Sequence, residues 1–461
     1  MYNAYITKVK NVRPHPNADR LDLVDCFDNT VCVSRDSFAE GGLAVYFPTD
    51  GQLSEEFCQA HNLVRKKDDA GNNIGGYMDP DKRNVKAINL RGEKSDGLIM
   101  PLDCLAYTGV DLATLEEGFC FTTINGKEIC CKYIPRSNRR AAAGSGNRTR
   151  KHRVPVAPLF AEHADTEQLA YNLSAFRPGD EIEITLKMHG TSGRTARLPV
   201  LKGYRRTFLD RLFRRQGTPI YENGYVSGTR RVVLEDYEGG FYGDNSFREQ
   251  HSKVFEGKLM KGETVYYEIV GFTSTGAPIM GDGNNEKVGK DFVKQYGKTT
   301  TFSYGCEPTG LKKVYGQDEI SIYCIEEEAP QSDIYVYRMT MTNEDGFVVE
   351  YTPDFMRYRC EQMGVKCVPV FTRFMLNDYD LELDTRTAGE IVKDIAERYY
   401  AGPDPIGKTH TREGVVVRII NRPKFCAYKH KNFEFKVLEG IIKETAAAPD
   451  MEEAQELEGK E

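Results

Sequence analysis

A lysine that ends an alternating strand, followed by a glycine turn, is the feature of this sequence best suited to chemistry. The strand predicted in GDEIEITLK, residues 179–187, alternates apolar with polar side chains from Ile182 onward, and its last polar residue is Lys187. Gly190 follows in MHGTSG and permits a sharp turn that brings backbone N–H groups toward a phosphate. A strand end of this kind can present an amine nucleophile to a bound phosphate.

The same four-residue pattern, KxxG, occurs four times, so it is a weak signal by itself. Besides Lys187, it begins at Lys94 (KSDG), Lys294 (KQYG) and Lys313 (KVYG). Lys94 follows the turn NLRGE rather than an alternating strand. The residues further along the chain must therefore decide which lysine is chemically relevant.

Those residues supply the groups that phosphoryl chemistry on a nucleotide needs, namely carboxylates for a divalent metal, an aromatic surface and further cations. They are Glu268 in YYEIVG, Tyr337 in IYVYRM, Glu413 in REGVVVR, and Lys429 and Lys431 in AYKHKNFEF. Strand alternation places Lys429 and Lys431 on one face, where both can reach one phosphate. Singly, each has an ordinary explanation as a surface carboxylate, a core aromatic or a solvated lysine. Their joint order after Lys187 favours the functional interpretation.

This order resembles the covalent nucleotidyltransferases, the superfamily of ligases and capping enzymes in which the motif lysine forms a phosphoramidate with a nucleotide. His189 replaces the aspartate of the KxDG form, and the resulting KxHGT is similar to the nick-sealing RNA ligases. VSGTRR looks like the motif that places an arginine near the nucleotide, with Arg230 preferred and Arg231 left open. The long spacing from Lys187 to Arg230 reflects the basic insert KGYRRTFLDRLFRR, from Lys202 to Arg215.

The resemblance implies a role for each of these residues. Lys187 would be the catalytic nucleophile, and Glu413 would hold Mg²⁺ or Mn²⁺. The nucleotide-binding residues would be His189, Gly190, Arg230, Glu268, Tyr337, Lys429 and Lys431. The cofactor would be ATP, and AMP would pass from Lys187 to the 5′-phosphate of a nicked strand before the 3′-OH attacks and expels it.

The N-terminal third carries no such constellation. Its short β-type runs alternate with turn residues, which predicts a small β-barrel, and its HPNADRLDLV resembles OB-fold RNA-binding domains. The expected fold class is α+β, with an OB-like barrel followed by a mixed α+β adenylyltransferase domain (ATP-grasp-like, DNA/RNA ligase type) built on antiparallel sheets. An OB domain ahead of the catalytic domain resembles one RNA ligase family, which implies sealing of 3′-OH/5′-phosphate nicks. The expected partner is a nicked RNA duplex or RNA–DNA hybrid.

Composition and charge divide the chain further. We expect an OB-like domain over residues 1–135, a basic linker over 136–153, the catalytic domain over 154–443 and an acidic tail over 444–461. The net charge is −7, but the tail alone contributes −6, and two stretches, 136–153 and 202–215, are strongly basic. These stretches are either solvated surface or phosphate contacts. A helix is predicted over residues 385–400, with Asp384 or Thr385 as its cap.

The remaining expectations are of a soluble cytosolic monomer with reduced thiols. No apolar run approaches 18 residues, and the twelve cysteines include no CxxC pair. Three alternatives stay open: a capping-type guanylyltransferase, a DNA ligase, and a noncatalytic RNA-binding protein that retains a decayed nucleotidyltransferase domain.

Overall fold

The chain divides into two compact units. In this computed structural model the described residues are 2–67, 69, 74–133, 154–163, 166–213, 215, 217–230, 232–235, 237, 245–274, 278–301, 332–377, 386–408 and 410–445. The first unit contains Met1–Arg136, Gly283–Thr299 and Phe433–Ala446, and the second contains Ser137–Asp282, Thr300–Asn432 and Ala447–Glu461. The predicted linker 136–153 and the acidic tail from residue 446 onward lie outside the described residues.

The first unit is built from short strands, as its turn-rich sequence predicts. Antiparallel pairing joins four strands in the order β10-β1-β5-β9 and three in the order β2-β3-β4, and the β7–β8 hairpin forms a separate ladder. Their bounds are β1 Ala4–Lys8, β2 Lys10–Pro14, β3 Leu21–Cys26, β4 Asn29–Ser34, β5 Leu43–Phe47, β7 Ala87–Leu90, β8 Glu93–Asp96, β9 Leu98–Pro101 and β10 Cys120–Phe121. The smaller ladders use β6 Gly51–Leu53 with β13 Cys130–Lys132, and β11 Thr123–Ile124 with β12 Lys127–Glu128. Val45, Phe47 and Phe57 lie in the apolar core of this unit.

Three helices of this unit come from distant parts of the chain: α1 Glu55–Ala60, α5 Lys290–Tyr296 and α10 Phe433–Thr445. Helix α10 is held against the β7–β8 hairpin by two ion pairs, Lys94 with Glu434 at 2.9 Å and Lys436 with Asp96 at 2.6 Å. The hairpin β20 Asp282–Asn284 with β21 Thr299–Thr301 flanks α5.

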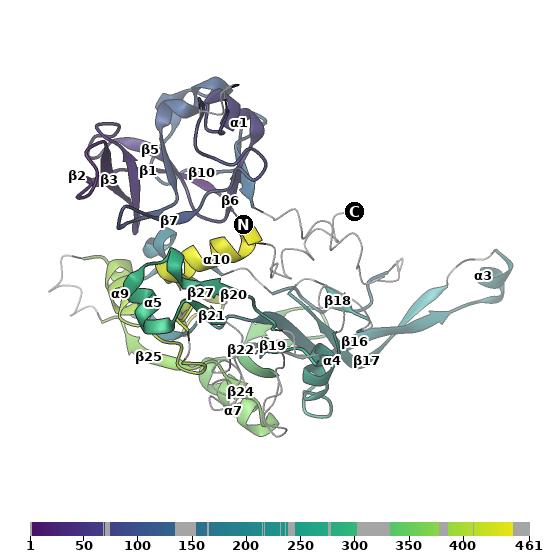
Figure 1. Ribbon diagram of the computed structural model, residues 1–461. Helices are drawn as coiled ribbons and strands as arrows, with labels where there is room; N and C mark the ends of the chain where they lie inside the picture. Colours follow the sequence, from purple (N-terminus) through teal and green to yellow (C-terminus); the bar gives the residue numbers. More distant parts are fainter. Residues whose placement is uncertain are drawn as a thin grey trace. The chain divides into compact units, whose positions relative to one another are not determined.

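Two large sheets lie in the part of the second unit that the structure describes (Figure 1). One has the order β14-β27-β26-β15-β25, with bounds β14 Glu167–Gln168, β15 Glu181–Leu186, β25 Val370–Met375, β26 Gly414–Ile419 and β27 Cys426–Lys431. The other has the order β18-β17-β16-β19-β22-β23, with bounds β16 Thr191–Arg205, β17 Thr218–Gly228, β18 Val233–Leu234, β19 Glu263–Gly271, β22 Ser332–Thr342 and β23 Val348–Glu350. Pairing is antiparallel except that β14 runs parallel to β27, and β24 Lys366–Cys367 parallel to β22.

In the described residues of this unit the helices are α3 Phe208–Leu212, α4 Ser246–Lys253, α7 Pro353–Met363 and α9 Ala388–Glu397. Short 3₁₀ turns occur in both units, at Leu102–Thr108, Leu112–Thr114, Leu169–Tyr171, Leu173–Ala175 and Asn285–Lys287. Helix α9 confirms the helix predicted over residues 385–400, and it buries Val392 and Ala396 in an apolar core shared with the first sheet.

The predicted cap of α9 is wrong. Thr387 is the N-cap, and its hydroxyl accepts from the backbone N–H of Glu390, whose carboxylate accepts in return from the backbone N–H of Thr387. This reciprocal capping box starts the helix later than Asp384 or Thr385, which lie outside the described residues. The described cysteines are free thiols, as expected, and no helix in the described part of the chain is both long and apolar enough to cross a membrane.

Candidate active site

A buried carboxylate, Glu413, is the centre of the candidate site. Its side chain is 3% exposed, and it contacts three of the residues that the sequence singles out. The ammonium of Lys187 lies 2.7 Å from Oε1, the ammonium of Lys431 lies 3.3 Å from the same oxygen, and His189 Nδ1 lies 3.1 Å from Oε2. Residues separated by more than two hundred positions in the chain therefore meet at one acid.

The electrostatics of Glu413 follow from these neighbours. Burial alone would raise the pKa of a carboxyl group, but the charges of Lys187 and Lys431 and the hydrogen bond with His189 hold the pKa of Glu413 well below its usual range. Glu413 is therefore an anion at neutral pH, in a place where an unpaired charge would be costly.

Strand register explains how Lys187 and Lys431 reach this acid. β15 and β27 are the two neighbours of β26 in the first sheet. Lys187, just past the end of β15, donates its backbone N–H to the carbonyl of Gly414, at 3.0 Å. Lys431 is the register partner of the same glycine on β27, and Lys429 is the partner of Val416. Two residues apart on one strand, Lys429 and Lys431 share a face, as the alternation predicts.

Two glycines permit this close approach. Gly414 has φ +149°, and a Cβ there would lie 2.1 Å from the backbone oxygen of His430. A Cβ at Gly190 would lie 2.3 Å from the backbone oxygen of Ile269 and 3.0 Å from Cγ of Glu268. Any larger residue would push the Lys187 turn away from β19, so Gly190 brings the turn to the strand that carries Glu268.

Glu268 and Tyr337 lie on the second sheet, on β19 and β22, and both are partly buried. Glu268 is the register partner of Ser192 on one side and of Tyr335 on the other. Tyr337 packs against an apolar cluster that includes Met188, the residue next to Lys187. The two sheets therefore meet beside the nucleophile candidate.

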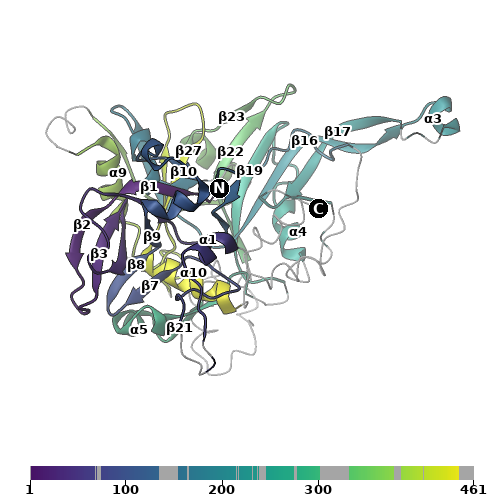
Figure 2. The same cartoon turned by 90° about the horizontal axis from the view of Figure 1, so that it is seen from above.

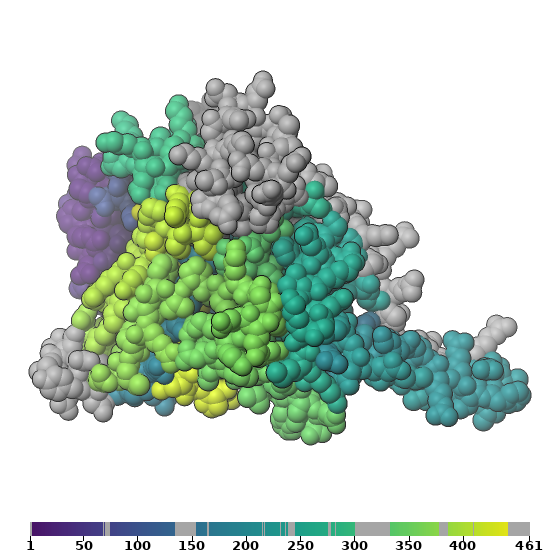
Figure 3. Space-filling view, turned by 90° about the horizontal axis from the view of Figure 1, so that it is seen from below, coloured from purple at the N-terminus to yellow at the C-terminus, as the bar shows by residue number. Residues whose placement is uncertain are grey.

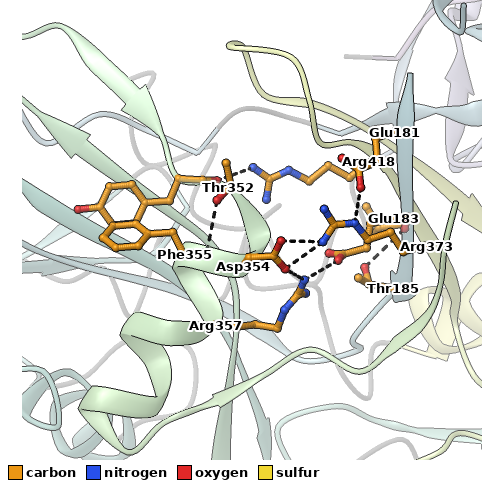
Figure 4. A network of polar contacts seen from close by, with 11 residues as sticks. Glu181, Glu183, Thr185, Thr352, Asp354, Phe355, Arg357, Arg373 and Arg418 are labelled. Carbon is orange, nitrogen blue, oxygen red and sulfur yellow. Dashed lines mark hydrogen bonds and ion pairs between the residues drawn. The ribbon is translucent and has the colours of Figure 1, made fainter. Parts of the chain in front are cut away.

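The strand that carries Lys187 is fastened by charged side chains on its flank (Figure 4). Glu183, 3% exposed, accepts from Arg357 of α7 at 2.8 Å, and Arg357 also pairs with Asp354. Arg373 of β25 joins Asp354 to Glu181 at 2.8 and 2.7 Å. Since losing Arg357 would leave the buried charge of Glu183 without compensation, this contact should resist displacement of β15.

Arg230 follows β17 and is positioned through its backbone. The neighbouring Thr229 carbonyl accepts from Nε of Arg194 at 2.8 Å, while the Arg230 carbonyl accepts from the backbone N–H of His163 at 3.3 Å. Arg194 is 1% exposed and its guanidinium lies 4.1 Å from the ring centroid of Phe160. Burial lowers the pKa of Arg194 to about 10, which still leaves it charged at neutral pH. Arg231 lies outside the described residues.

His163 is a residue that sequence reasoning missed. Its ring centroid lies 5.2 Å from that of Tyr337 and 5.3 Å from that of Tyr266, and Arg338 donates to its Nδ1 at 3.2 Å. Burial, reinforced by the charges of Arg338 and Arg230, lowers its pKa well below 6.5. A neutral imidazole therefore links the Arg230 segment to the aromatic candidate. A single histidine in an irregular segment gives no sequence signal for such a role.

The donor set around Glu413 bears on metal binding. No group of three or more His, Cys, Asp or Glu side chains suited to a metal occurs in the described part of the chain. One buried carboxylate fits a Mg²⁺-like cation that shares its coordination with nucleotide phosphates and water, rather than a metal enclosed by protein ligands alone.

Comparisons with known proteins agree with this architecture. Residues 3–102 match a family model of an OB-fold domain. A mutant of the Naegleria gruberi RNA ligase with AMP and manganese is 16% identical, covers 94% of this chain and 97% of its own, and has a TM-score of 0.53. The structure of that ligase with pyrophosphate gives 16% identity, 96% and 98% coverage and a TM-score of 0.53. No curated protein sequence matches this chain.

These findings confirm the expected fold. The N-terminal part is an OB-fold domain, and nearly the whole chain shares its α+β architecture with an RNA ligase. At this identity the likeness concerns the fold.

Proposed function

We propose that this chain is an ATP-dependent RNA ligase that forms a lysyl-AMP intermediate on Lys187 and seals 3′-OH/5′-phosphate nicks in RNA or RNA-containing duplexes. The main support for this proposal is that Lys187, His189 and Lys431 all contact the buried Glu413. The fold supports the proposal, since Naegleria gruberi RNA ligase structures contain AMP or ATP with manganese.

In the first step Nζ of Lys187 attacks the α-phosphorus of ATP. An N–P bond forms, the bond to the bridging oxygen breaks, and pyrophosphate leaves. The amine must be neutral to attack, so the ammonium that contacts Glu413 first gives its proton to solvent. A divalent cation held by Glu413 would supply positive charge at the phosphates and compete with the ammonium for that carboxylate.

The other cations stabilise charge rather than react. Lys431 stays near the acid, and Lys429, on the same face, can offset negative charge on the phosphoryl group as it transfers. Glu268 and Tyr337, on the adjacent sheet, are our candidates for the ribose and the adenine ring. The AMP then moves to the 5′-phosphate of the nick, and attack by the 3′-OH releases it.

The mass of the purified protein after incubation with ATP and Mg²⁺ or Mn²⁺ tests the first step. We expect a gain of one AMP. A gain of GMP from GTP instead would identify a capping-type enzyme, and no gain with any nucleotide would favour a noncatalytic RNA-binding protein.

Sealing assays test the second half of the proposal. Nicks with an RNA 3′-OH strand should be sealed, and all-DNA nicks should be sealed poorly. Equal sealing of both would point to a DNA ligase.

A further inference from the structure

The proposed activity leaves the basic insert between Lys187 and Arg230 unexplained. It forms a two-stranded arm, β16 and β17, that begins and ends in the second sheet (Figures 1 and 2). Only residues 191–196 of β16 pair with β19, whereas the ladder between β16 and β17 continues out to the pair of Arg205 with Thr218. The pair of Leu201 with Tyr221 still contacts the rest of the unit, since the Leu201 N–H donates to the Val156 carbonyl and the Tyr221 hydroxyl to the Pro155 carbonyl. Beyond this pair the arm continues as a two-stranded ribbon, seen extending from the rest of the second unit in Figure 3.

Both ends of the arm are anchored at candidate site residues. β16 starts at Thr191, directly after Gly190, and β17 ends at Gly228, two residues before Arg230. At ~3.3 Å per residue, the fifteen residues of β16 extend at most ~50 Å from the site. At ~3.4 Å per base pair, that distance corresponds to roughly 15 base pairs of duplex.

The tip of the arm, residues 202–215, combines exposed apolar side chains with a sequence rich in cations. Phe208, Leu209, Leu212 and Phe213 are 78%, 60%, 62% and 61% exposed. Six cations, Lys202, Arg205, Arg206, Arg211, Arg214 and Arg215, outnumber the single acid, Asp210. That acid is used locally, because Asp210 completes the capping box of α3 with Thr207.

We propose that this tip is a second contact for the nucleic-acid substrate, on the duplex flank up to roughly 15 base pairs from the nick. The arginines would contact phosphates, and Phe208 and Phe213 would lie against base or sugar edges in the groove, as apolar side chains do in minor-groove proteins. The proposal rests on the proposed function. Charge favours this occupant, since the tip carries 6 − 1 = +5 in a chain whose net charge is −7.

The geometry also favours a duplex over the other surfaces that a basic apolar tip can bind. An anionic membrane would attract the same side chains, but α3 has only five residues, whereas membrane-surface helices are commonly 20–30 residues long. A duplex held at Lys187 extends in a straight line for tens of ångströms, and the ribbon starts at that same place.

The test compares a tip variant with a matched control. The tip variant carries Arg205→Gln, Arg206→Gln, Arg211→Gln and Arg215→Gln, all at exposed positions. The control removes the same charge elsewhere, with Lys253→Gln, Lys261→Gln, Lys366→Gln and Arg398→Gln, four exposed cations paired with acids off the arm. Binding of nicked RNA duplexes with flanks of about 8 or about 20 base pairs is measured at several salt concentrations, lengths chosen on either side of the expected reach.

On the long-flank duplex, the tip variant should bind at least tenfold more weakly, and the slope of log affinity against log salt should flatten by about 0.9 for each lost phosphate contact. On the short-flank duplex, tip variant and wild type should bind alike, and the control should match wild type on both. A second variant joins Leu201 to Tyr221, which are register partners, through Asn-Gly and should reproduce the loss without exposing the apolar tip.

Other outcomes would overturn the proposal. These are an unchanged slope, an equal loss on both duplexes, or an equal loss in the control. Binding of phosphatidylserine vesicles that requires the tip, with unchanged duplex binding, would assign the tip to a membrane. Self-association that Phe208→Ser with Phe213→Ser abolishes, again with unchanged duplex binding, would assign it to a second copy of this chain. AMP-adduct formation, measured on the same proteins without nucleic acid, tests the proposed function separately.

Discussion

Two KxxG segments of this molecule have the same signature and different surroundings. At Lys187 the pattern ends a strand of the second unit, and the ammonium contacts Glu413, which is 3% exposed and is shared with His189 and Lys431. At Lys94 the pattern lies on β8 of the first unit, where a side chain that is 52% exposed pairs with Glu434 and lies 4.9 Å from the ring centroid of Phe433. A buried acid with several cations distinguishes a candidate nucleophile from a structural contact.

The KSDG segment has its own structural purpose. Asp96, 6% exposed, accepts from Lys436 at 2.6 Å, so both charged residues of KSDG hold helix α10. Its glycine, Gly97, has φ +102° and leaves no room for a Cβ beside Tyr46 and Phe47. The match of KSDG to the KxDG form is therefore explained by packing within the first unit.

The largest expected difference is in AMP-adduct formation, between variants of Lys187 and of Lys94. Lys187→Ala should lower formation of the covalent AMP adduct by at least about 1,000-fold, because it removes the proposed nucleophile. Lys94→Ala should leave adduct formation within about threefold of wild type, since Lys94 only fastens α10. Intact-mass measurement after ATP and Mg²⁺ checks both, and an adduct on the Lys187 variant would refute the proposed chemistry.

Variants of the two buried acids, Glu413 and Asp96, should differ nearly as much in their rates of adduct formation. Glu413→Gln leaves Lys187 and Lys431 without their counter-charge, so it should slow adduct formation by about 100-fold or more and lower the free energy of unfolding by about 2–4 kcal/mol. Asp96→Asn should destabilise by about 1–3 kcal/mol through its weakened contact with Lys436 and leave the adduct rate nearly unchanged. Urea unfolding and single-turnover labelling with ATP separate the two effects. Similar adduct rates for both variants would remove the distinction between the acids.

The glycines of the two KxxG segments, Gly190 and Gly97, should show the same difference. Gly190→Ala places a Cβ against the backbone of Ile269, and Gly97→Ala forces an L-residue to φ +102°, so each should cost about 1–3 kcal/mol of folding stability. Only Gly190→Ala should also slow adduct formation, by about 10- to 100-fold, since it shifts the turn after Lys187. Rates measured well below the unfolding temperature of each variant isolate this effect.

Unfolding measured at low pH should reveal how strongly its neighbours stabilise the ionised form of Glu413. Its folded-state pKa is depressed, so its stabilising contribution is complete above the unfolded value of 4.5 and is lost as pH falls from there through the lower folded pKa. The difference in unfolding free energy between wild type and Glu413→Gln should therefore be constant from pH 7 to about 5.5 and shrink below about 4.5. A difference that already shrinks near pH 6 would contradict the strong pairing.

The strands and the order of the site residues could be predicted from the sequence because both depend on local patterns. Alternation placed Lys429 and Lys431 on one face, and chain order placed Glu413 after Lys187. The sequence could not indicate His163, which lies in an irregular segment, or Arg194, which lies in β16, because both act through contacts with the distant backbone of Thr229 and Arg230. It also missed that the KSDG segment binds α10, since Lys94 and Glu434 are 340 positions apart.

The smallest expected effect is the influence of salt on the folding stability of the variants. The pair of Lys94 with Glu434 is partly exposed, so Lys94→Ala should cost under about 1 kcal/mol of folding stability at low ionic strength. In about 1 M salt, where charges are screened beyond about 3 Å, most of that cost should disappear, leaving the packing of the lysine stem on Phe433. The cost of Glu413→Gln should change little under the same conditions, because solvent ions cannot enter around an acid that is 3% exposed. Urea unfolding of the two variants and wild type at low and high salt measures this, and an equal response to salt would show that burial does not distinguish the two lysines.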